Sequence, residues 1–318
     1  MTRAVVTGAS GLLGGAVVRE LMRHADAVEG WSHAVEAAPD GVRFRTLDLR
    51  DASAAERVLR AARPDLVVHC AALTDVDRCE SDREAAAALN AAVPGRLAAT
   101  AYALGSRFVH VSTDAVYDGE RAGLHDETET PRPVNAYART KLDGERAVMA
   151  AHRAALVVRT TMHGWSAQGR VSFSEAIVRA LLRGEPMSLF SDVRFSPLVV
   201  TDLAAVIRRL AEQGAAGGVN VGAADAVSKE EFGRLVAREF GLADDPIVSV
   251  RVADRGLRAP RPRNCALAVG RLTGLLGEPP PTVRDGVRRM CADADSGAAA
   301  RLKGRAAGSL GALAEAAA

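Results

Sequence analysis

Short apolar runs alternate with amphipathic stretches along the first half of the chain. The apolar runs predict strands, and the stretches between them, whose apolar residues recur every three or four positions, predict helices. Strands are predicted at 3–7, 26–32, 42–49, 65–71, 107–112 and 156–160, and helices at 12–22, 52–62 and 83–104. Strands that alternate with helices indicate a parallel sheet with helices on both faces. The predicted fold class is α/β, a Rossmann-type doubly wound sheet.

The alternation becomes less regular after residue 161. Helices are predicted at 173–182, 203–212 and 230–240, and short strands at 219–221 and 247–250. Ser228, with Glu231 three residues later, has the pattern of a capping box at the start of the last of these helices. We therefore divide the chain into a domain built on the sheet (1–160), a smaller α/β region partly interleaved with the sheet (161–292) and a low-complexity tail (293–318).

The composition is that of an ordinary globular protein. The chain has 318 residues, of which 48% are hydrophobic and 25% charged, and its net charge is +2. This small charge, without a basic stripe, argues against a nucleic-acid partner. No apolar stretch approaches the roughly 20 residues of a membrane span, and the N-terminus lacks the layout of a signal peptide. We expect a cytoplasmic protein without a membrane partner.

Cysteines and histidines give no sign of a metal site. His69 and His110 lie in predicted strands and are interpreted as packed core residues. No spacing typical of a disulfide or of metal ligands joins the four cysteines, which are Cys70, Cys79, Cys265 and Cys291. We expect no bound metal.

Three glycines with regular spacing separate the first predicted strand from the first predicted helix. They are Gly8, Gly11 and Gly14 in the run Thr7-Gly-Ala-Ser-Gly-Leu-Leu-Gly14. Such glycines permit a tight turn and a close approach of the backbone to a pyrophosphate, which the helix N-terminus then attracts. We predict a dinucleotide site here that also includes Ser10, Leu12 and Leu13. Residues 1–160 are therefore predicted to be an NAD(P)-binding domain, and 161–292 a substrate-binding region.

The end of the second predicted strand bears on the choice of cofactor. A carboxylate at this place binds the ribose 2′-hydroxyl of NAD(H) and disfavours a 2′-phosphate. Glu29 falls in the middle of the strand, whereas its end offers Ser32 and His33. This favours NADP(H) over NAD(H), without excluding NAD(H), and makes Ser32 a candidate cofactor contact.

Tyr137 and Lys141 are four residues apart in a predicted helix. Residues at this spacing share a helix face, so a phenol and an ammonium would point into the same cleft. The chain has three tyrosines, and only three of its 41 basic residues are lysines. A Lys retained in so Arg-rich a chain indicates a need for a compact cation. We expect the ammonium to lower the pKa of the phenol, which would protonate an alkoxide.

Five segments give the chain a resemblance to a known family, the extended short-chain dehydrogenase/reductases, and within it the dTDP-4-dehydrorhamnose reductase group. The segments are Thr7-Gly-Ala-Ser-Gly-Leu-Leu-Gly14, Ala71-Ala-Leu-Thr-Asp-Val-Asp77, Ser112-Thr-Asp-Ala-Val-Tyr-Asp-Gly119, Pro133-Val-Asn-Ala-Tyr-Ala-Arg-Thr-Lys-Leu-Asp-Gly-Glu145 and Arg261-Pro-Arg-Asn264. The resemblance covers residues 3 to 290. It implies an NAD(P)H-dependent reductase of a keto-deoxysugar nucleotide, and it leaves a homodimer open.

The resemblance also implies roles for individual residues. Thr113, Tyr137 and Lys141 would form the catalytic triad, and Tyr137 and Lys141 would also contact the cofactor. Further cofactor contacts would come from the adenine-binding Asp48 and Leu49, from the backbone of Ala71 and Ala72, and from Thr160 or Thr161 near the nicotinamide.

Several substrate-side positions depart from the family pattern. Met162 stands where members often have a Trp, Ser172-Phe173 replaces Asn-Phe, and the run Asp192–Leu198 replaces Asp-Gln-x-Gly-x-Pro-Thr. Ala16 stands where some members have an acid linked to a metal. These changes leave the identity of the sugar and of its nucleotide open. Candidate contacts to a diphosphate are Arg194, Arg258, Arg261 and Arg263.

Two alternatives to a reductase stay open. One is a non-catalytic NADP-binding regulatory subunit, like the regulatory subunit of methionine adenosyltransferase, which resembles the same family. The other is a sugar-nucleotide epimerase or dehydratase. Dehydratases of this superfamily usually carry an acid pair after Ser-Thr, whereas Asp114 is followed by Ala115 here. Fold resemblance alone does not separate these chemistries.

Overall fold

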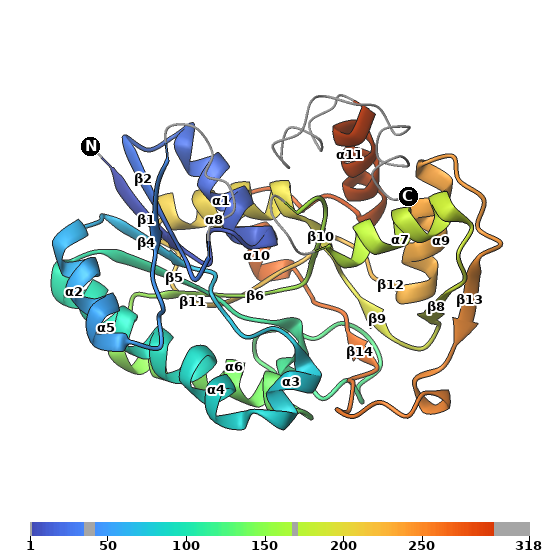
Figure 1. Cartoon of the computed structure of the whole chain (residues 1–318), viewed down its shortest axis with the longest axis horizontal. Coiled ribbons are helices and arrows are strands. Elements are labelled where there is room, and N and C mark those ends of the chain that lie inside the picture. Colours follow the sequence, from blue (N-terminus) through green and yellow to red (C-terminus); the bar gives the residue numbers. More distant parts are fainter. Residues whose placement is uncertain (1, 35–41, 167–170, 296–318) are drawn as a thin grey trace.

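A seven-stranded parallel sheet forms the larger part of the molecule in the computed structural model, which describes residues 2–34, 42–166 and 171–295 (Figure 1). Its strand order is β11-β6-β5-β4-β1-β2-β3. The strands are β1 (Arg3–Thr7), β2 (Ala27–Ser32), β3 (Arg43–Thr46), β4 (Leu66–His69), β5 (Arg107–Val111), β6 (Leu156–Thr160) and β11 (Gly217–Val221). The predicted doubly wound α/β fold is confirmed.

The order in which the chain adds strands to the sheet reverses between β1 and β4. From β1 the chain proceeds outward to β2 and β3, then crosses back to β4 and continues through β5 and β6 to β11. In such sheets ligands bind at the carboxyl ends of the strands where the order reverses. Gly8 follows β1 and Ala71 lies two residues after β4, so the glycine loop and the Ala71 segment meet at this point.

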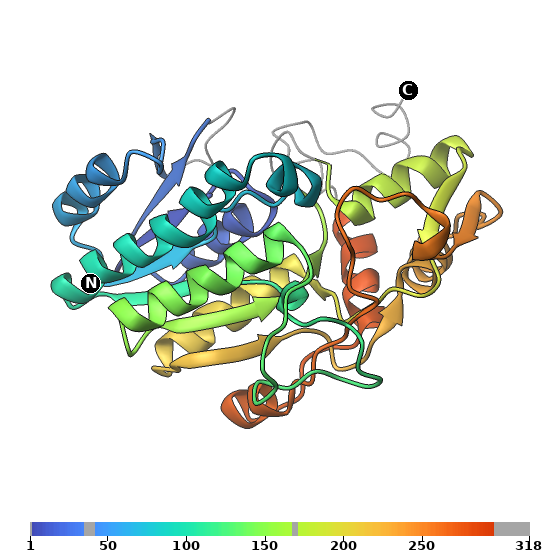
Figure 2. The ribbon, with the colours of Figure 1, turned by 90° about the horizontal axis from the view of Figure 1, so that it is seen from below.

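Helices cover both faces of the sheet (Figures 1 and 2). On one face lie α1 (Leu12–Met22), α8 (Val200–Glu212) and α10 (Gly270–Leu276); on the other lie α2 (Ala52–Ala62), α5 (Val93–Leu104) and α6 (Ala136–Ala151). Because both faces are covered, central strands such as β4 are buried at every position. This burial explains why the strands appear in the sequence as continuous apolar runs.

The prediction of one continuous helix at 83–104 is wrong, because the helix is interrupted. The structure has α4 (Arg83–Ala87), a π-helical turn η1 (Ala88–Ala92) and α5, preceded by the unpredicted α3 (Val76–Ser81). The turn brings Asn90 against α6, where a Cβ on Gly144 would lie only 2.1 Å from the Asn90 carbonyl oxygen. The Asn90 amide also binds the backbone of Leu73 and the hydroxyl of Thr140. These contacts between distant segments have no counterpart in the local alternation of apolar residues.

A second, smaller core lies beside the carboxyl edge of the sheet (Figure 1). It is built around Phe232, Trp165 and Met290, which are all buried. Its elements are α7 (Phe173–Arg183), α9 (Lys229–Glu239), α11 (Val283–Asp295), β8 (Met187–Phe190) and β13 (Ile247–Val250). Short strands connect it to the large sheet: β7 (Met162–His163), β9 (Arg194–Phe195), β10 (Leu198–Val199), β12 (Val227–Ser228) and β14 (Asn264–Cys265).

The helices and strands predicted after residue 161 are present, with some ends shifted by a few residues. The predicted strand at 219–221 is β11, which joins the large sheet beside β6. The capping box predicted at Ser228 and Glu231 is present at the start of α9. Of the predicted tail, residues 293–295 belong to α11, and 296–318 lie outside the described residues.

Candidate active site

The glycine loop has the close packing that its sequence predicts. Gly8 has a φ of +66°, and a Cβ added to it would lie 2.7 Å from the Ala71 backbone nitrogen. A Cβ on Gly14 would lie 2.1 Å from the Gly8 carbonyl oxygen, which already accepts a hydrogen bond of 2.9 Å from the Gly11 nitrogen. Side chains at these positions would displace backbone, so the loop requires glycine.

The N-terminus of α1 opens onto this loop. Gly11 is the N-cap and supplies no side-chain cap, so the first N–H groups of the helix have no side-chain acceptor. Leu13 packs into the large core and Leu12 lies partly buried against it. The Ser10 nitrogen donates to the Ser32 hydroxyl at 2.8 Å, which ties the loop to the end of β2. A helix end of this kind attracts a phosphate group.

The end of β2 carries no free carboxylate. Glu29 accepts hydrogen bonds from Trp31 at 2.9 Å and from Arg45 at 2.8 Å. Ser32, the last residue of β2, is buried, and His33, which follows it, is exposed. The paired state of Glu29 agrees with the interpretation of this strand end from the sequence.

The remaining predicted cofactor residues lie along the same edge of the sheet. Asp48 follows β3 and binds Arg50, whose hydrogen bonds lower the pKa of the Asp48 carboxyl to about 2. The Leu49 side chain packs into the core below the sheet. Ala71 and Ala72 follow β4 and are half-buried, and Thr161 follows β6.

Lys141 is buried at the end of β5. Its ammonium donates a hydrogen bond of 2.7 Å to the Val111 carbonyl oxygen. Burial lowers the pKa of the Lys141 ammonium to about 8, an effect that Glu145, one helical turn further on, partly offsets. Lys141 also lies close enough to His69 and His110 to help keep their pKa low, although burial is the larger cause.

Tyr137 lies one turn before Lys141 on the same face of α6, beside Thr113. The expected lowering of its pKa by Lys141 is wrong. Burial raises the pKa of the Tyr137 phenol to about 12, because a phenolate is poorly solvated there; the hydroxyl of Thr113 offsets part of the effect. Tyr137 is therefore protonated at neutral pH. The structure brings the three predicted catalytic residues together.

Asp114 is a member of this cluster that the sequence analysis assigned no role. The Thr113 hydroxyl donates to Asp114 Oδ1 at 3.1 Å. Burial raises the pKa of the Asp114 carboxyl to about 6, and the nearby ammonium of Lys229 offsets part of this rise. The signal available in the sequence is its place next to Thr113.

A buried ion pair lies one helical turn beyond Lys141. Arg159 in β6 forms a bidentate pair with Glu145, with nitrogen–oxygen distances of 2.7 and 3.1 Å. Ser112 donates to the same carboxylate at 2.5 Å, and Arg159 also donates to the Tyr117 hydroxyl at 2.9 Å. The sequence analysis missed this pair, although Glu145 follows Lys141 at helical spacing.

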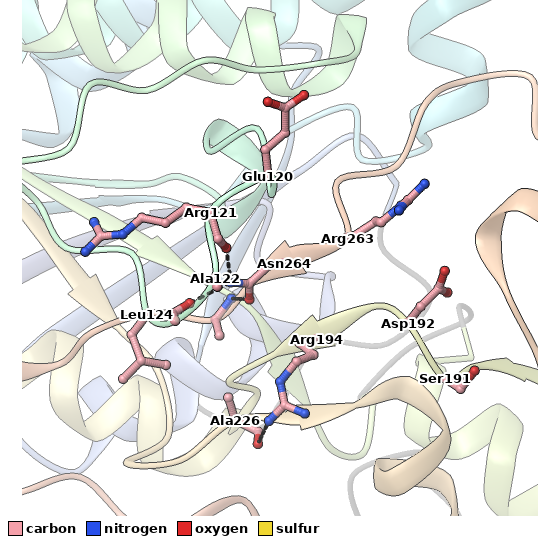
Figure 3. Close-up of a pocket in the computed structure, with 12 residues that line it drawn as sticks. Glu120, Arg121, Ala122, Leu124, Ser191, Asp192, Arg194, Ala226, Arg263 and Asn264 are labelled. Carbon is pink, nitrogen blue, oxygen red and sulfur yellow. Dashed lines mark hydrogen bonds between the residues drawn. The ribbon is translucent and has the colours of Figure 1, made fainter.

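A pocket of about 420 Å³ opens between the loop that follows Asp114 and the strands β9 and β14 (Figure 3). Arg194 and Arg263 line it, and Arg194 donates to the Ala226 carbonyl at 2.8 Å. Arg261, predicted for the same role, instead lies 3.3 Å from Asp77. The other residues that line the pocket are Glu120, Arg121, Ala122, Gly123, Leu124, Ser191, Asp192, Asn264 and Ala266.

The predicted core histidines and free cysteines are present as expected. His69 and His110 are buried, and burial lowers the pKa of His69 to about 3. All four cysteines are free thiols. Within residues 2–34, 42–166 and 171–295, no helix combines the length and apolarity needed to cross a membrane. In the same ranges, no three His, Cys, Asp or Glu side chains group as a metal site would need.

One protein-family model matches nearly the whole chain. Residues 2–296 match the model of the RmlD substrate binding domain. The chain belongs to this family. The match includes the glycine loop, the Thr113 segment and the helix that carries Tyr137 and Lys141, and the resemblance stated from the motifs is confirmed.

The relatives include reductases and a subunit of methionine adenosyltransferase 2. The probable low-salt glycan biosynthesis reductase Agl14 of Haloferax volcanii is 36% identical over 286 residues, which cover 89% of this chain and 95% of the relative. The dTDP-4-dehydrorhamnose reductase of Mycobacterium tuberculosis is 36% identical, with 84% of each chain covered. Methionine adenosyltransferase 2 subunit beta of Pongo abelii is 32% identical, covering 86% of this chain and 82% of the relative.

Solved structures of the RmlD family share the fold. The dTDP-4-dehydrorhamnose reductase of Bacillus anthracis, solved in complex with NADP, superposes with a TM-score of 0.82 at 27% identity. The alignment covers 92% of this chain and 99% of the other. Other neighbours are solved with NAD, so this fold accommodates either dinucleotide.

Proposed function

We propose that the protein is an NAD(P)H-dependent reductase of the ketone in a keto-deoxysugar nucleotide. The observation that carries the proposal is the convergence of Thr113, Tyr137 and Lys141 at the carboxyl end of β5, next to the glycine loop. The reductase relatives support the same chemistry, because the Agl14 and dTDP-4-dehydrorhamnose reductase names both describe a reduction.

The loop fits a dinucleotide. Gly8, Gly11 and Gly14 allow the tight turn of the loop and its close packing on the backbone of Ala71, and the uncapped start of α1 offers N–H groups to a pyrophosphate. A reduced nicotinamide bound here would supply the hydride that the ketone carbon accepts. We assign the cofactor as NADP(H), because the end of β2 presents Ser32 and His33 instead of a free carboxylate.

Tyr137 supplies the proton. When the ketone is reduced, its oxygen becomes an alkoxide, and the phenol transfers its proton to that oxygen. The raised pKa of Tyr137 keeps the proton in place until the alkoxide, a stronger base, forms. The resulting phenolate is then stabilised by the Lys141 ammonium one turn away. The Thr113 hydroxyl donates its one proton to Asp114 in the structure and would turn it to the reacting oxygen when the substrate binds.

We assign the nucleotide end of the substrate to the pocket between β9 and β14. Arg194 and Arg263 would meet the diphosphate there, since a guanidinium binds phosphate oxygens with two parallel donors. Alternate residues of a strand point to opposite sides, so Arg194 and Asn264 line the pocket while Phe195 and Cys265 lie toward the catalytic cluster. The sugar would then lie at the cluster.

The test follows NADPH absorbance with a panel of dTDP- and UDP-linked 4-keto-6-deoxyhexoses. Tyr137→Phe removes the proton donor and is expected to lower kcat by about 10²–10⁴-fold. The matched control is Tyr102→Phe, since Tyr102 is 64% exposed on α5. Turnover by the Tyr137→Phe variant at the wild-type rate would refute the assigned chemistry, whereas NADPH binding by fluorescence should survive in both variants.

A regulatory subunit is the second candidate, and the relationship to methionine adenosyltransferase 2 subunit beta favours it. Under this alternative the chain would bind the dinucleotide but turn over no sugar. The test mixes the purified chain with a methionine adenosyltransferase catalytic subunit and measures co-elution and any change in its rate. A stoichiometric complex, together with no NADPH consumption on the sugar panel, would decide for this candidate.

A further inference from the structure

Lys229 is a second lysine close to the catalytic cluster, where its ammonium interacts with the charge of Asp114. It is the first residue of α9, and its Nζ lies 3.2 Å from the centroid of the Phe195 ring and 4.9 Å from that of Phe173. Only two other lysines occur among the 41 basic residues of the chain. The rarity of lysine that singles out Lys141 in so Arg-rich a chain therefore applies to Lys229 as well.

The position is an unfavourable one for a cation. The N-terminus of a helix carries partial positive charge, which repels an ammonium. Burial adds to this and lowers the pKa of Lys229 to about 8. The aromatic faces of Phe195 and Phe173 compensate in part through cation–π attraction. A Lys kept at such a place indicates a use for its charge.

The aromatic rings come from segments in which the chain departs from the family pattern. Phe195 belongs to the run Asp192–Leu198 and stands where that pattern has Gly. Phe173 follows Ser172, which replaces the Asn of the pattern. Of the two rings beside the Lys229 ammonium, Phe195 is thus a departure from the common pattern, whereas Phe173 is part of it.

The ammonium of Lys229 has no hydrogen bond or ion pair to any described residue; it faces the rings and the charge of Asp114. The two opposite charges influence each other, yet no ion pair within 4.0 Å joins them. The other titratable groups that act on this pair are the thiol of Cys265 and the phenol of Tyr137. An unpaired ammonium opposite a carboxylate leaves a donor and an acceptor for a ligand.

We propose that Lys229 positions the keto sugar, with its Nζ donating to a sugar hydroxyl that in turn donates to the Asp114 carboxylate. A hydroxyl is the group that completes such a pair, because it accepts one hydrogen bond and donates another. The inference rests on the proposed reductase function. It deepens that function by naming the substrate class as a keto sugar with a free hydroxyl next to the ketone.

The contact between Thr113 and Asp114 is the reason to place the sugar hydroxyl on a carbon next to the ketone. Thr113 holds the ketone oxygen in the proposed mechanism, and its hydroxyl lies 3.1 Å from Asp114 Oδ1. Two substrate oxygens bound by these groups must be close neighbours, as oxygens on adjoining ring carbons are. The sugar is thereby held with its ketone toward Tyr137 and its hydroxyl toward Lys229.

The test compares two substrates in two variants. The substrates are a dTDP-linked 4-keto-6-deoxyhexose and its analogue that lacks the hydroxyl at the carbon next to the ketone. The variants are Lys229→Met and the control Arg238→Met, which removes a cation from the exposed side of the same helix. An uncharged Met side chain can occupy the space beside Phe195 and Phe173, so the variant is expected to fold.

Wild type and the Arg238→Met variant should prefer the hydroxylated substrate by about 10- to 100-fold in kcat/KM, the range for a hydrogen bond to a charged group. The Lys229→Met variant should lose a similar factor on that substrate and discriminate less than about threefold, with NADPH affinity unchanged. If the Lys229→Met variant discriminates as wild type does, the role of Lys229 is wrong while the reductase stands. If wild type consumes no NADPH with any member of the panel, the reductase falls and the role of Lys229 falls with it.

A second measurement needs no turnover. With lysines labelled at ¹³Cε, the Lys229 signal is the one that disappears in Lys229→Met. It should shift when the reduced sugar nucleotide, the product, is added with NADP⁺, and should not shift with NADP⁺ alone. An unmoved Lys229 signal in the presence of bound product would overturn the proposal.

Discussion

Lys141 on α6 donates a 2.7 Å hydrogen bond to the carbonyl oxygen of Val111, the last residue of β5. Together with the hydrogen bonds of Ser112 and Arg159 to Glu145, this contact ties the helix to the carboxyl end of the strand. Thr113 lies two residues beyond Val111 and Tyr137 one helical turn before Lys141, so the contact also sets the phenol beside the threonine hydroxyl. The packing of α6 on the end of β5 thus brings the three residues of the cluster together. It also buries the Lys141 ammonium, so the charge of Lys141 depends on this packing.

Activity should fall as pH rises through about 8, because burial lowers the pKa of Lys141 to about 8. Between this value and the unfolded value of about 10.4, the unfolded chain binds more protons at Lys141 than the folded chain. The contribution of Lys141 to the free energy of unfolding therefore rises with pH in this window while the ammonium is lost. The measurement is kcat/KM against pH, with thermal melts in the same buffers.

Burial lowers the pKa of Lys229 to about 8 as well, so the decline in the Lys229→Met variant isolates the effect of Lys141, and the double variant Lys141→Met/Lys229→Met should show no decline near pH 8. Melts of the wild type should show no loss of structure there. A decline that persists unchanged in the double variant would assign it to another group.

Glu145→Ala should destabilise the protein strongly. It leaves the buried guanidinium of Arg159 without its bidentate partner, and breaking such a pair costs about 3–5 kcal/mol. Urea unfolding measures the loss. Asp143→Ala on the same helix is the control: its pair with Arg146 is exposed and should cost less than about 1 kcal/mol. Equal losses in the two variants would contradict the burial argument.

Gly14→Ala should abolish dinucleotide binding. The new Cβ would lie 2.1 Å from the Gly8 carbonyl oxygen, so the loop backbone must shift, at a cost in stability of about 1–3 kcal/mol. Fluorescence titration with NADPH measures the binding. Gly274→Ala in α10 is the control, since nothing lies within 4 Å of its added Cβ, and it should stabilise the helix by about 0.5–1 kcal/mol. Wild-type affinity in the Gly14→Ala variant would show that the loop tolerates a side chain.

His33→Asp should reverse the choice of cofactor. A carboxylate after β2 would repel a 2′-phosphate and accept a hydrogen bond from a ribose hydroxyl. We expect KM for NADPH to rise by about tenfold or more, roughly 1.4 kcal/mol, and KM for NADH to stay level or fall. His24→Asp, an identical replacement beyond the far end of α1, should change neither value. Parallel changes for both cofactors would place the 2′-position elsewhere.

Local patterns were sufficient to predict most of the elements of the large sheet. The strand at β6 and the helix α2 occur at the predicted residues, because each is marked by a complete apolar run or period with clear ends. The glycine loop was predicted for the same reason: its requirement for glycine is met by residues close together in the chain. The interruption at Ala88–Ala92 was not, since it depends on contacts of Asn90 with Leu73 and Gly144.

The site was predicted in part. Tyr137 and Lys141 share a helix face, which spacing alone shows. The pKa of Tyr137 was predicted in the wrong direction, because burial, the larger effect, depends on residues such as Leu73 and Cys79 that pack around it. Two contacts were not predicted, because their partners are far apart in sequence: the ion pair of Glu145 with Arg159 and the contact of Lys229 with Phe195.

The sequence by itself determined the order of strands and helices, the glycine loop and the helical spacing of Tyr137 and Lys141, since each depends on neighbours within a turn or a strand. Only the tertiary structure decided which charges are buried, which ion pairs form and where Lys229 points. Desolvation and Coulomb energies depend on distances in space, and these are set by the packing of segments from both halves of the chain.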